Sequence, residues 1–145
     1  MTIVASLSTG TGSQRLCSLR PGSAEGWVSI PNSPDLFFEY GDPHSMRCVE
    51  DVLYIVSGYD ESGASRDALQ AYDPSTRTWA RRAPIPEPRS YSARVQLAGR
   101  LYILGGFLAT SMEADGPDTH LTSVFSCDPR TDRWRSESPL PLEDH

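Results

Sequence analysis

The 145-residue chain contains no lysine, although it carries 13 basic residues, all of them arginine. It therefore has no side-chain amine for the attachment of ubiquitin or an acetyl group, although a codon bias towards arginine explains this composition more simply. The formal net charge is −6, and the arginines form no basic run. An acidic chain without a basic patch argues against nucleic acid or an anionic membrane surface as the main partner.

Cysteine is scarce as well, with Cys17, Cys48 and Cys127 far apart and no CxxC pair. This pattern favours a reducing compartment over a disulfide scaffold. The N-terminal residues 1–15 have no basic start and only a short apolar run, so they are a poor secretory signal. No run is apolar for long enough to cross a bilayer. We therefore expect a cytoplasmic protein, with the nucleus as the alternative, and no membrane partner.

The usual sequence signs of a catalytic or metal site are missing too. None of the three histidines, His44, His120 and His145, has metal-ligand spacing to another histidine or to a cysteine. There is no Gly-x-Ser-x-Gly motif, and the Gly-Thr-Gly at 10–12 lacks the lysine of a phosphate-binding loop. We expect no metal, no cofactor and no enzymatic activity.

What the sequence does contain is an internal repeat of about 50 residues. Three blocks occur twice in the same order: an apolar run that contains Leu-Tyr-Ile and a glycine, an Asp-Pro-x-Thr turn that leads to a tryptophan, and a Pro-x-Pro. The blocks lie at 53–59, 73–79 and 84–86, and again at 101–107, 128–134 and 139–141. A period of this length is typical of propellers and solenoids.

Each repeat predicts four short strands joined by tight turns, and no segment has the pattern of an amphipathic helix. The Leu-Tyr-Ile runs suit a buried strand, and the later segments alternate as a half-exposed strand does. In the turns, an aspartate can accept from backbone amides and a proline presets the next φ. The predicted strands are 45–50, 52–58, 67–73 and 76–82 in one repeat, and 92–98, 100–106, 122–128 and 131–137 in the other.

These residues resemble kelch repeats, in which a tyrosine-containing strand ends in Gly-Gly and an aspartate-led turn precedes a tryptophan. The matching residues are Tyr54, Gly58, Asp73 and Trp79 in one repeat, and Tyr102, Gly105, Gly106, Asp128 and Trp134 in the other. Ser57 stands in place of the first glycine of the earlier repeat. Arg89 matches the arginine that often opens a kelch repeat, and no arginine stands at the equivalent place before residue 45. The resemblance covers about residues 45–141.

The resemblance implies an all-β fold of two four-stranded antiparallel kelch blades plus a partial third, that is, an incomplete β-propeller. We expect a flexible segment at 1–26, a blade remnant with its connection at 27–42, repeats at 43–90 and 91–141, a loop insert at about 108–121, and a tail at 142–145. Propellers close with four or more blades. The chain therefore reads as a fragment or truncated isoform of a longer kelch protein, or as one of several copies that assemble.

An antiparallel meander places alternate loops on one end, so 58–66, 84–92 and 106–120 should share a rim. Aromatic and arginine side chains favour peptide recognition, and in kelch relatives this rim often grips short peptides. The predicted partner-binding residues are Arg89, Ser90, Tyr59, Tyr91, Ser92, Phe107 and Arg66.

The resemblance to the BTB-kelch group implies a protein-interaction module for the substrate of a cullin-based ubiquitin ligase. The BTB domain that would recruit the cullin is absent from this chain. The alternatives are an actin-associated kelch protein and, third, a copper enzyme related to galactose oxidase.

Overall fold

The computed structural model describes residues 2–8, 14–31, 46–56, 62, 64–109 and 119–141. All regular elements in these ranges are strands, as predicted. The described residues therefore contain no helix that could cross a membrane. The strands are β1 (Ile3–Ser8), β2 (Gln14–Leu19), β3 (Trp27–Ile30), β4 (Met46–Val49), β5 (Val52–Val56), β6 (Leu69–Asp73), β7 (Thr78–Arg82), β8 (Ala93–Leu97), β9 (Arg100–Leu104), β10 (Phe107–Leu108), β11 (Thr119–His120), β12 (Val124–Asp128) and β13 (Arg133–Ser136).

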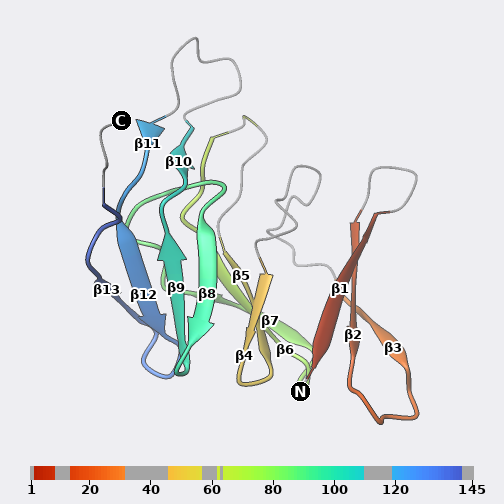
Figure 1. Ribbon diagram of the computed structural model, residues 1–145. Coiled ribbons are helices and arrows are strands. Elements are labelled where there is room, and N and C mark those ends of the chain that lie inside the picture. The colour runs from red at the N-terminus through yellow and green to blue at the C-terminus, as the bar shows by residue number, and fades with distance from the viewer. Residues whose placement is uncertain are drawn as a thin grey trace.

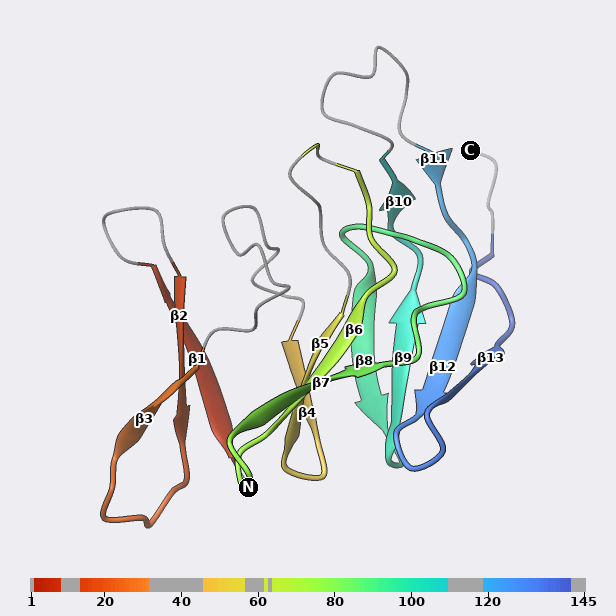
Figure 2. The same ribbon diagram turned by 180° about the vertical axis from the view of Figure 1, so that it is seen from behind.

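Two four-stranded antiparallel sheets confirm the two predicted blades. Their strand orders are β4-β5-β6-β7 and β8-β9-β12-β13, so each sheet is a meander of neighbouring strands. The first strands, β4 and β8, lie near each other, and Arg47 on β4 donates from Nε to the carbonyl of Arg94 on β8 (3.1 Å). Figure 1 shows the sheets standing side by side in chain order, and Figure 2 shows the same arrangement from behind. This is part of a β-propeller.

The hairpin between the first two strands of each blade has the geometry that a two-residue connection requires. Glu50 and Asp51 both have positive φ (49° and 66°), and so do Ala98 and Gly99 (50° and 74°). A primed turn of this kind matches the twist of the flanking strands. The Asp-Pro turns also form as predicted, because Asp73 accepts from the amide of Ser75 (2.9 Å) and Asp128 from that of Arg130 (3.0 Å).

The N-terminal region differs from the prediction. Residues 1–26 were expected to be flexible, but β1 and β2 pair there and continue into β3 as a three-stranded antiparallel sheet. The partial third blade is therefore larger than the remnant expected around Trp27. Its three strands contain four serines among 16 residues, so their apolar pattern is weak. What stabilises them is packing, because Leu16 and Ile30 are buried against the first full blade.

The core lies between the sheets in two layers. One layer joins the N-terminal sheet to the first full blade, and it includes Leu16, Ile30, Leu53, Ile55 and Tyr72. The other joins the two full blades, and it includes Val49, Val56, Leu69, Ile85, Leu101 and Ile103. Trp79 packs against the first layer and Trp134 against the second, which places both tryptophans between neighbouring sheets. The first full blade thus buries both of its faces, and each of the other two sheets buries the face that meets it.

Candidate functional site

Three loops meet at one end of the sheets, next to the short pair β10–β11 (Figure 1). The described part of the loop after β5 bonds to the loop after β10, since the amide of Ser65 donates to the carbonyl of Ala109 (2.8 Å). The connection between the blades joins them, because Ser90 and Phe107 exchange two backbone hydrogen bonds (2.9 and 3.0 Å). The three loops that the sequence assigned to a common rim therefore lie together in their described parts.

Ser65 fastens the three loops through its side chain. Its hydroxyl lies 2.6 Å from the hydroxyl of Ser90, and it accepts from the amide of Ala109 (2.9 Å). Hydroxyl groups suit this place because they both donate and accept. Sequence reasoning missed Ser65, since a serine in a loop carries no signal of its own.

Arg89 is buried completely rather than exposed on the rim. Its guanidinium donates to the carbonyls of Gly105 (3.0 Å) and Ser123 (2.9 Å) and to the hydroxyl of Ser123 (2.7 Å). It also lies over the ring of Phe125, 5.0 Å from the centroid. Burial lowers the pKa of Arg89, and the nearby carboxylate of Glu87 opposes this shift. This arginine ties the connection between the blades to the second blade, and it presents no surface for direct contact with a partner.

The other predicted rim residues divide into exposed and covered ones. Tyr91 is 57% exposed and stacks on Phe107, with ring centroids 5.2 Å apart and an interplanar angle of 20°. Ser90 and Ser92 are buried, and Arg66 and Phe107 are half-buried. Tyr59, like Gly58 of the repeat pattern, lies outside the described residues. Direct contact with a partner is open to Tyr91, Phe107 and Arg66.

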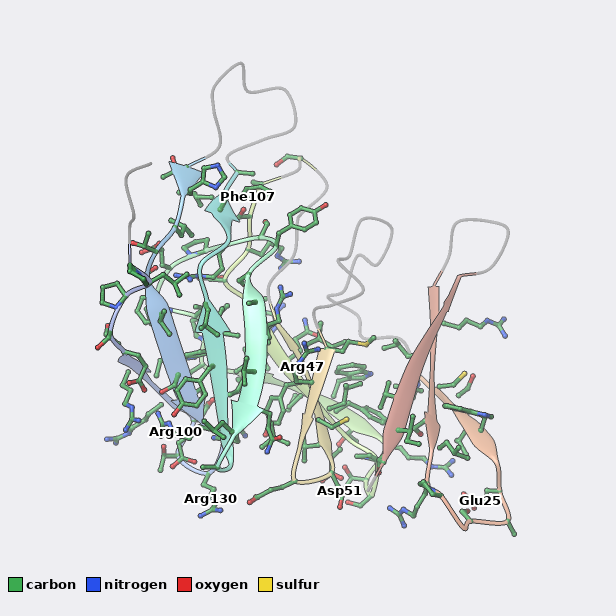
Figure 3. All side chains as sticks on the ribbon, in the orientation of Figure 1. Glu25, Arg47, Asp51, Arg100, Phe107 and Arg130 are labelled. Carbon is green, nitrogen blue, oxygen red and sulfur yellow. The ribbon has the colours of Figure 1, made fainter. Side chains whose placement is uncertain are left out.

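His120 was not among the predicted rim residues, because residues 108–121 were expected to form a loop insert. In the structure β10 and β11 pair at the base of this insert, and Phe107 lies opposite His120. Partners across a ladder project to the same side, so His120, which is exposed, lies beside the aromatic stack. We call Arg66, Tyr91, Phe107 and His120 the rim patch. Figure 3 shows Phe107 at the loop end of its sheet.

The structural repeat residues that the structure describes occupy equivalent places in the two blades. The indole of Trp79 donates to the carbonyl of Pro31 (2.7 Å) and that of Trp134 to the carbonyl of Ala83 (2.8 Å). Tyr54 is buried, and Tyr102, which is half-buried, holds the equivalent place on β9. Gly105 and Gly106 both have positive φ (61° and 90°).

Among the described residues, no group of three or more His, Cys, Asp and Glu side chains could hold a metal ion. A cavity of about 320 Å³ opens between the N-terminal sheet and the first blade, at the end opposite the rim, and Arg20, Glu25, Ser75 and Arg77 are among its lining residues. It contains no catalytic arrangement of side chains that we recognise.

The stacked four-stranded meanders define a β-propeller repeat protein. The model of the kelch motif matches residues 42–86 and 88–141, and the chain belongs to this family. It is 37% identical over 99 residues to the mouse "Kelch-like protein 35", covering 68% of this chain and 16% of that protein. It is 27% identical over 106 residues to the zebrafish (Danio rerio) "Kelch repeat and BTB domain-containing protein 12", covering 70% and 17%. The chain thus spans less than a fifth of each of these relatives.

Among solved structures, the chain is similar to the one titled "Structure of YjhT", with a TM-score of 0.64 and 16% sequence identity. The alignment covers 88% of this chain and 45% of that chain. At this identity the likeness shows the fold, a kelch propeller, and nothing about activity.

Proposed function

We propose that the chain is a protein-interaction module that grips a short peptide segment of its partner at the rim patch. The stacked pair Tyr91–Phe107 carries this proposal. An exposed tyrosine stacked on a half-buried phenylalanine and held by backbone hydrogen bonds is the type of surface on which binding energy concentrates. Membership of the kelch-repeat family supports the proposal that the partner is a protein.

The finer proposal is that this module selects the substrate of a cullin-based ubiquitin ligase adaptor. Support comes from a relative whose name includes a BTB domain. The proposed place of action is the cytoplasm, since Cys17, Cys48 and Cys127 are all free thiols. No contact among the described residues favours the actin-associated or the copper-enzyme alternative, and we propose no catalysis.

A selection from a displayed peptide library on the purified chain tests the binding proposal. Peptides enriched on the wild type should bind the Tyr91→Ala variant about 30-fold more weakly, the loss expected for a hot-spot aromatic. Gln96→Ala, which trims an exposed side chain on β8, is the matched control and should leave the affinity unchanged. Failure to enrich any peptide, or equal binding by Tyr91→Ala, would overturn the rim patch as the site.

The ligase proposal has a separate test. In cells the chain should bind the substrate without delivering it to a ligase, so its expression should raise the level of a protein that carries the selected peptide. Tyr91→Ala should not have this effect. If the substrate is bound but its level stays unchanged, the ligase role is wrong and the binding role stands.

A further inference from the structure

One cross-strand row of side chains occurs three times in the chain. It consists of an aliphatic residue, a residue on the next strand and a tryptophan on the last strand, all paired directly with one another. The three rows are Ile3–Leu19–Trp27, Leu53–Tyr72–Trp79 and Leu101–Cys127–Trp134. The N-terminal sheet is therefore a structural third copy of the repeat, which its sequence hardly reveals.

Two of these rows pack on the preceding sheet in the same way. The indoles of Trp79 and Trp134 donate to the carbonyls of Pro31 and Ala83, and each acceptor lies four residues after the tryptophan of the preceding sheet. Leu53 and Leu101 are nearly completely buried at these contacts. This side of a blade is built to cover the sheet before it.

The first row has no sheet before it among the described residues. Trp27 is 53% exposed and Ile3 is 43% exposed, whereas Leu53 and Leu101, which are equivalent to Ile3, are 1% and 0% exposed. We call Ile3, Leu19 and Trp27 the head face. It has the composition of a buried interface but is open to solvent.

On the last blade, the side that faces away from the first blade also exposes apolar residues to solvent. Val49 and Ile85 are each 2% exposed between the two blades, and their equivalents in the last blade are Leu97, which is 61% exposed, and Leu140, which is 38% exposed. The backbone repeats too, since the amides of Ile85 and Leu140 each donate over 2.8 Å to equivalent carbonyls, those of Asp67 and Thr122. We call Leu97, Leu140 and Val95 the tail face.

The centre of the tail side is more polar than the interface between the blades. Arg100 and Ser126 stand where the first blade has Val52 and Ala71. Their side chains bond to each other (2.8 Å), and Ser126 also donates to Glu137 (2.5 Å). Because Nε and Nη2 of Arg100 and the hydroxyl of Ser126 already have partners, covering these groups does not leave them unpaired. The side can be buried, with a smaller apolar gain than at the interface between the blades.

We propose that the head face of one copy packs on the tail face of a second copy, so that two chains form one ring. Head and tail are the two halves of a contact that the chain makes twice within itself, at the two interfaces between its sheets. Trp27 then donates to the carbonyl of Ser138 of the second copy, the residue four positions after Trp134. Two copies of three sheets give six blades, within the range in which propellers close, and a head-to-tail contact that closes makes a cyclic oligomer.

The size of the arc agrees with a half-ring. The alignment with the solved kelch propeller covers 45% of that chain, so two arcs of this size correspond to nearly the whole of it. Figure 1 shows that β1–β3 and the last blade stand at opposite ends of the row of sheets, as head-to-tail contact requires.

The test is light scattering behind size exclusion on the 145-residue chain over a range of concentrations. The wild type should form a particle of twice the chain mass. Trp27→Ala and Leu97→Arg should each weaken association at least tenfold, and Trp27→Phe, which loses the indole N–H and part of the ring surface, on the order of fivefold. Two controls should leave association unchanged. Tyr91→Ala removes an aromatic side chain of similar exposure at the rim. Gln96→Arg changes a residue on the same strand as Leu97 whose side chain projects from the other face of the sheet.

Mixing two variants distinguishes a head-to-tail contact from a contact between two identical faces. A Trp27→Ala chain retains its tail face and a Leu97→Arg chain its head face, so a mixed pair has one wild-type interface and one that carries both substitutions. Since an interface already broken by one substitution loses little more from the second, the mixture should associate more tightly than either variant alone. Circular dichroism shows whether each variant is folded, and Leu140→Glu replaces Leu97→Arg if that chain unfolds. A wild type that stays monomeric, association that survives both substitutions, or a series of ever larger assemblies would overturn the two-chain ring.

Discussion

At the scale of single residues, burial separates chemistry that looks alike in the sequence. Arg89 and Arg66 were both predicted as rim residues. Arg89, however, has no exposed surface, and its guanidinium donates hydrogen bonds to the carbonyls of Gly105 and Ser123. Those carbonyls belong to the two connections that flank the β10–β11 insert. Arg89 therefore supports the rim patch from within, whereas Tyr91 is exposed and Arg66 is half-buried.

Cys127 makes the stability of the protein sensitive to alkali. It is buried between the two blades, where burial first, and then the negative charge of Asp132, raise its pKa from 9.0 to about 11. The folded pKa lies above the unfolded one, so the stabilisation is complete below pH 9 and is lost as the pH rises towards 11. The urea midpoint of the wild type should fall across this window, and that of Cys127→Ala should fall less.

A second thiol provides the comparison for this prediction. Burial and the charge of Asp51 raise the pKa of Cys48 as well, but Cys48 is only half-buried. Cys48→Ala should therefore remove a smaller part of the alkaline decline than Cys127→Ala. Equal declines in Cys127→Ala and the wild type would contradict the assignment.

At the scale of elements, the two adjacent glycines after β9 have different tasks. A Cβ on Gly106 would lie 2.4 Å from the carbonyl oxygen of Ser90 and 2.9 Å from the amide of Ser92, both backbone atoms of the connection between the blades. A Cβ on Gly105 would meet first the end of the Leu140 side chain, at 3.0 Å. The backbone at Ser90 is fixed by its two hydrogen bonds to Phe107, so it cannot give way.

We therefore expect Gly106→Ala to lower the free energy of unfolding by at least about 3 kcal/mol, through strain at positive φ and overpacking together. Gly105→Ala should cost about 1 kcal/mol, mainly from its positive φ. Urea unfolding of the two variants measures the difference. Similar losses for both would mean that the connection between the blades can move away from β10.

The two full blades could be predicted element by element, because tyrosine, glycine, aspartate and tryptophan recur at fixed spacing and each has a local task. The N-terminal sheet could not, since β1 and β2 owe their pairing to contacts of residues such as Leu16 with a neighbouring sheet. For the rim, the alternation of loops predicted that the three segments meet. Which side chains face outward depends on hydrogen bonds such as those of Ser65 and Arg89, which no pattern in the sequence encodes.

At the scale of the whole molecule, each hydrophobic core is built from residues of two neighbouring sheets. The layer between the two full blades takes Val56 and Leu69 from one sheet and Leu101 and Ile103 from the other. The backbone is linked there as well, since the carboxylate of Asp132 accepts from the amide of Ala83 (2.9 Å). In such a stack, the stability of one repeat depends on the interface with its neighbour.

Ile103→Ala tests this dependence. The side chain is completely buried on β9, and its truncation should cost about 3 kcal/mol. If the blades open together, hydrogen exchange should accelerate in β5 and β6 of the first blade as much as in β9 and β12 of the second. Arg133→Ala, an exposed change on β13, should leave both sets of amides unchanged. Faster exchange confined to the second blade would mean that the first blade and the N-terminal sheet form a stable unit, and that the interface between the blades contributes to shape more than to stability.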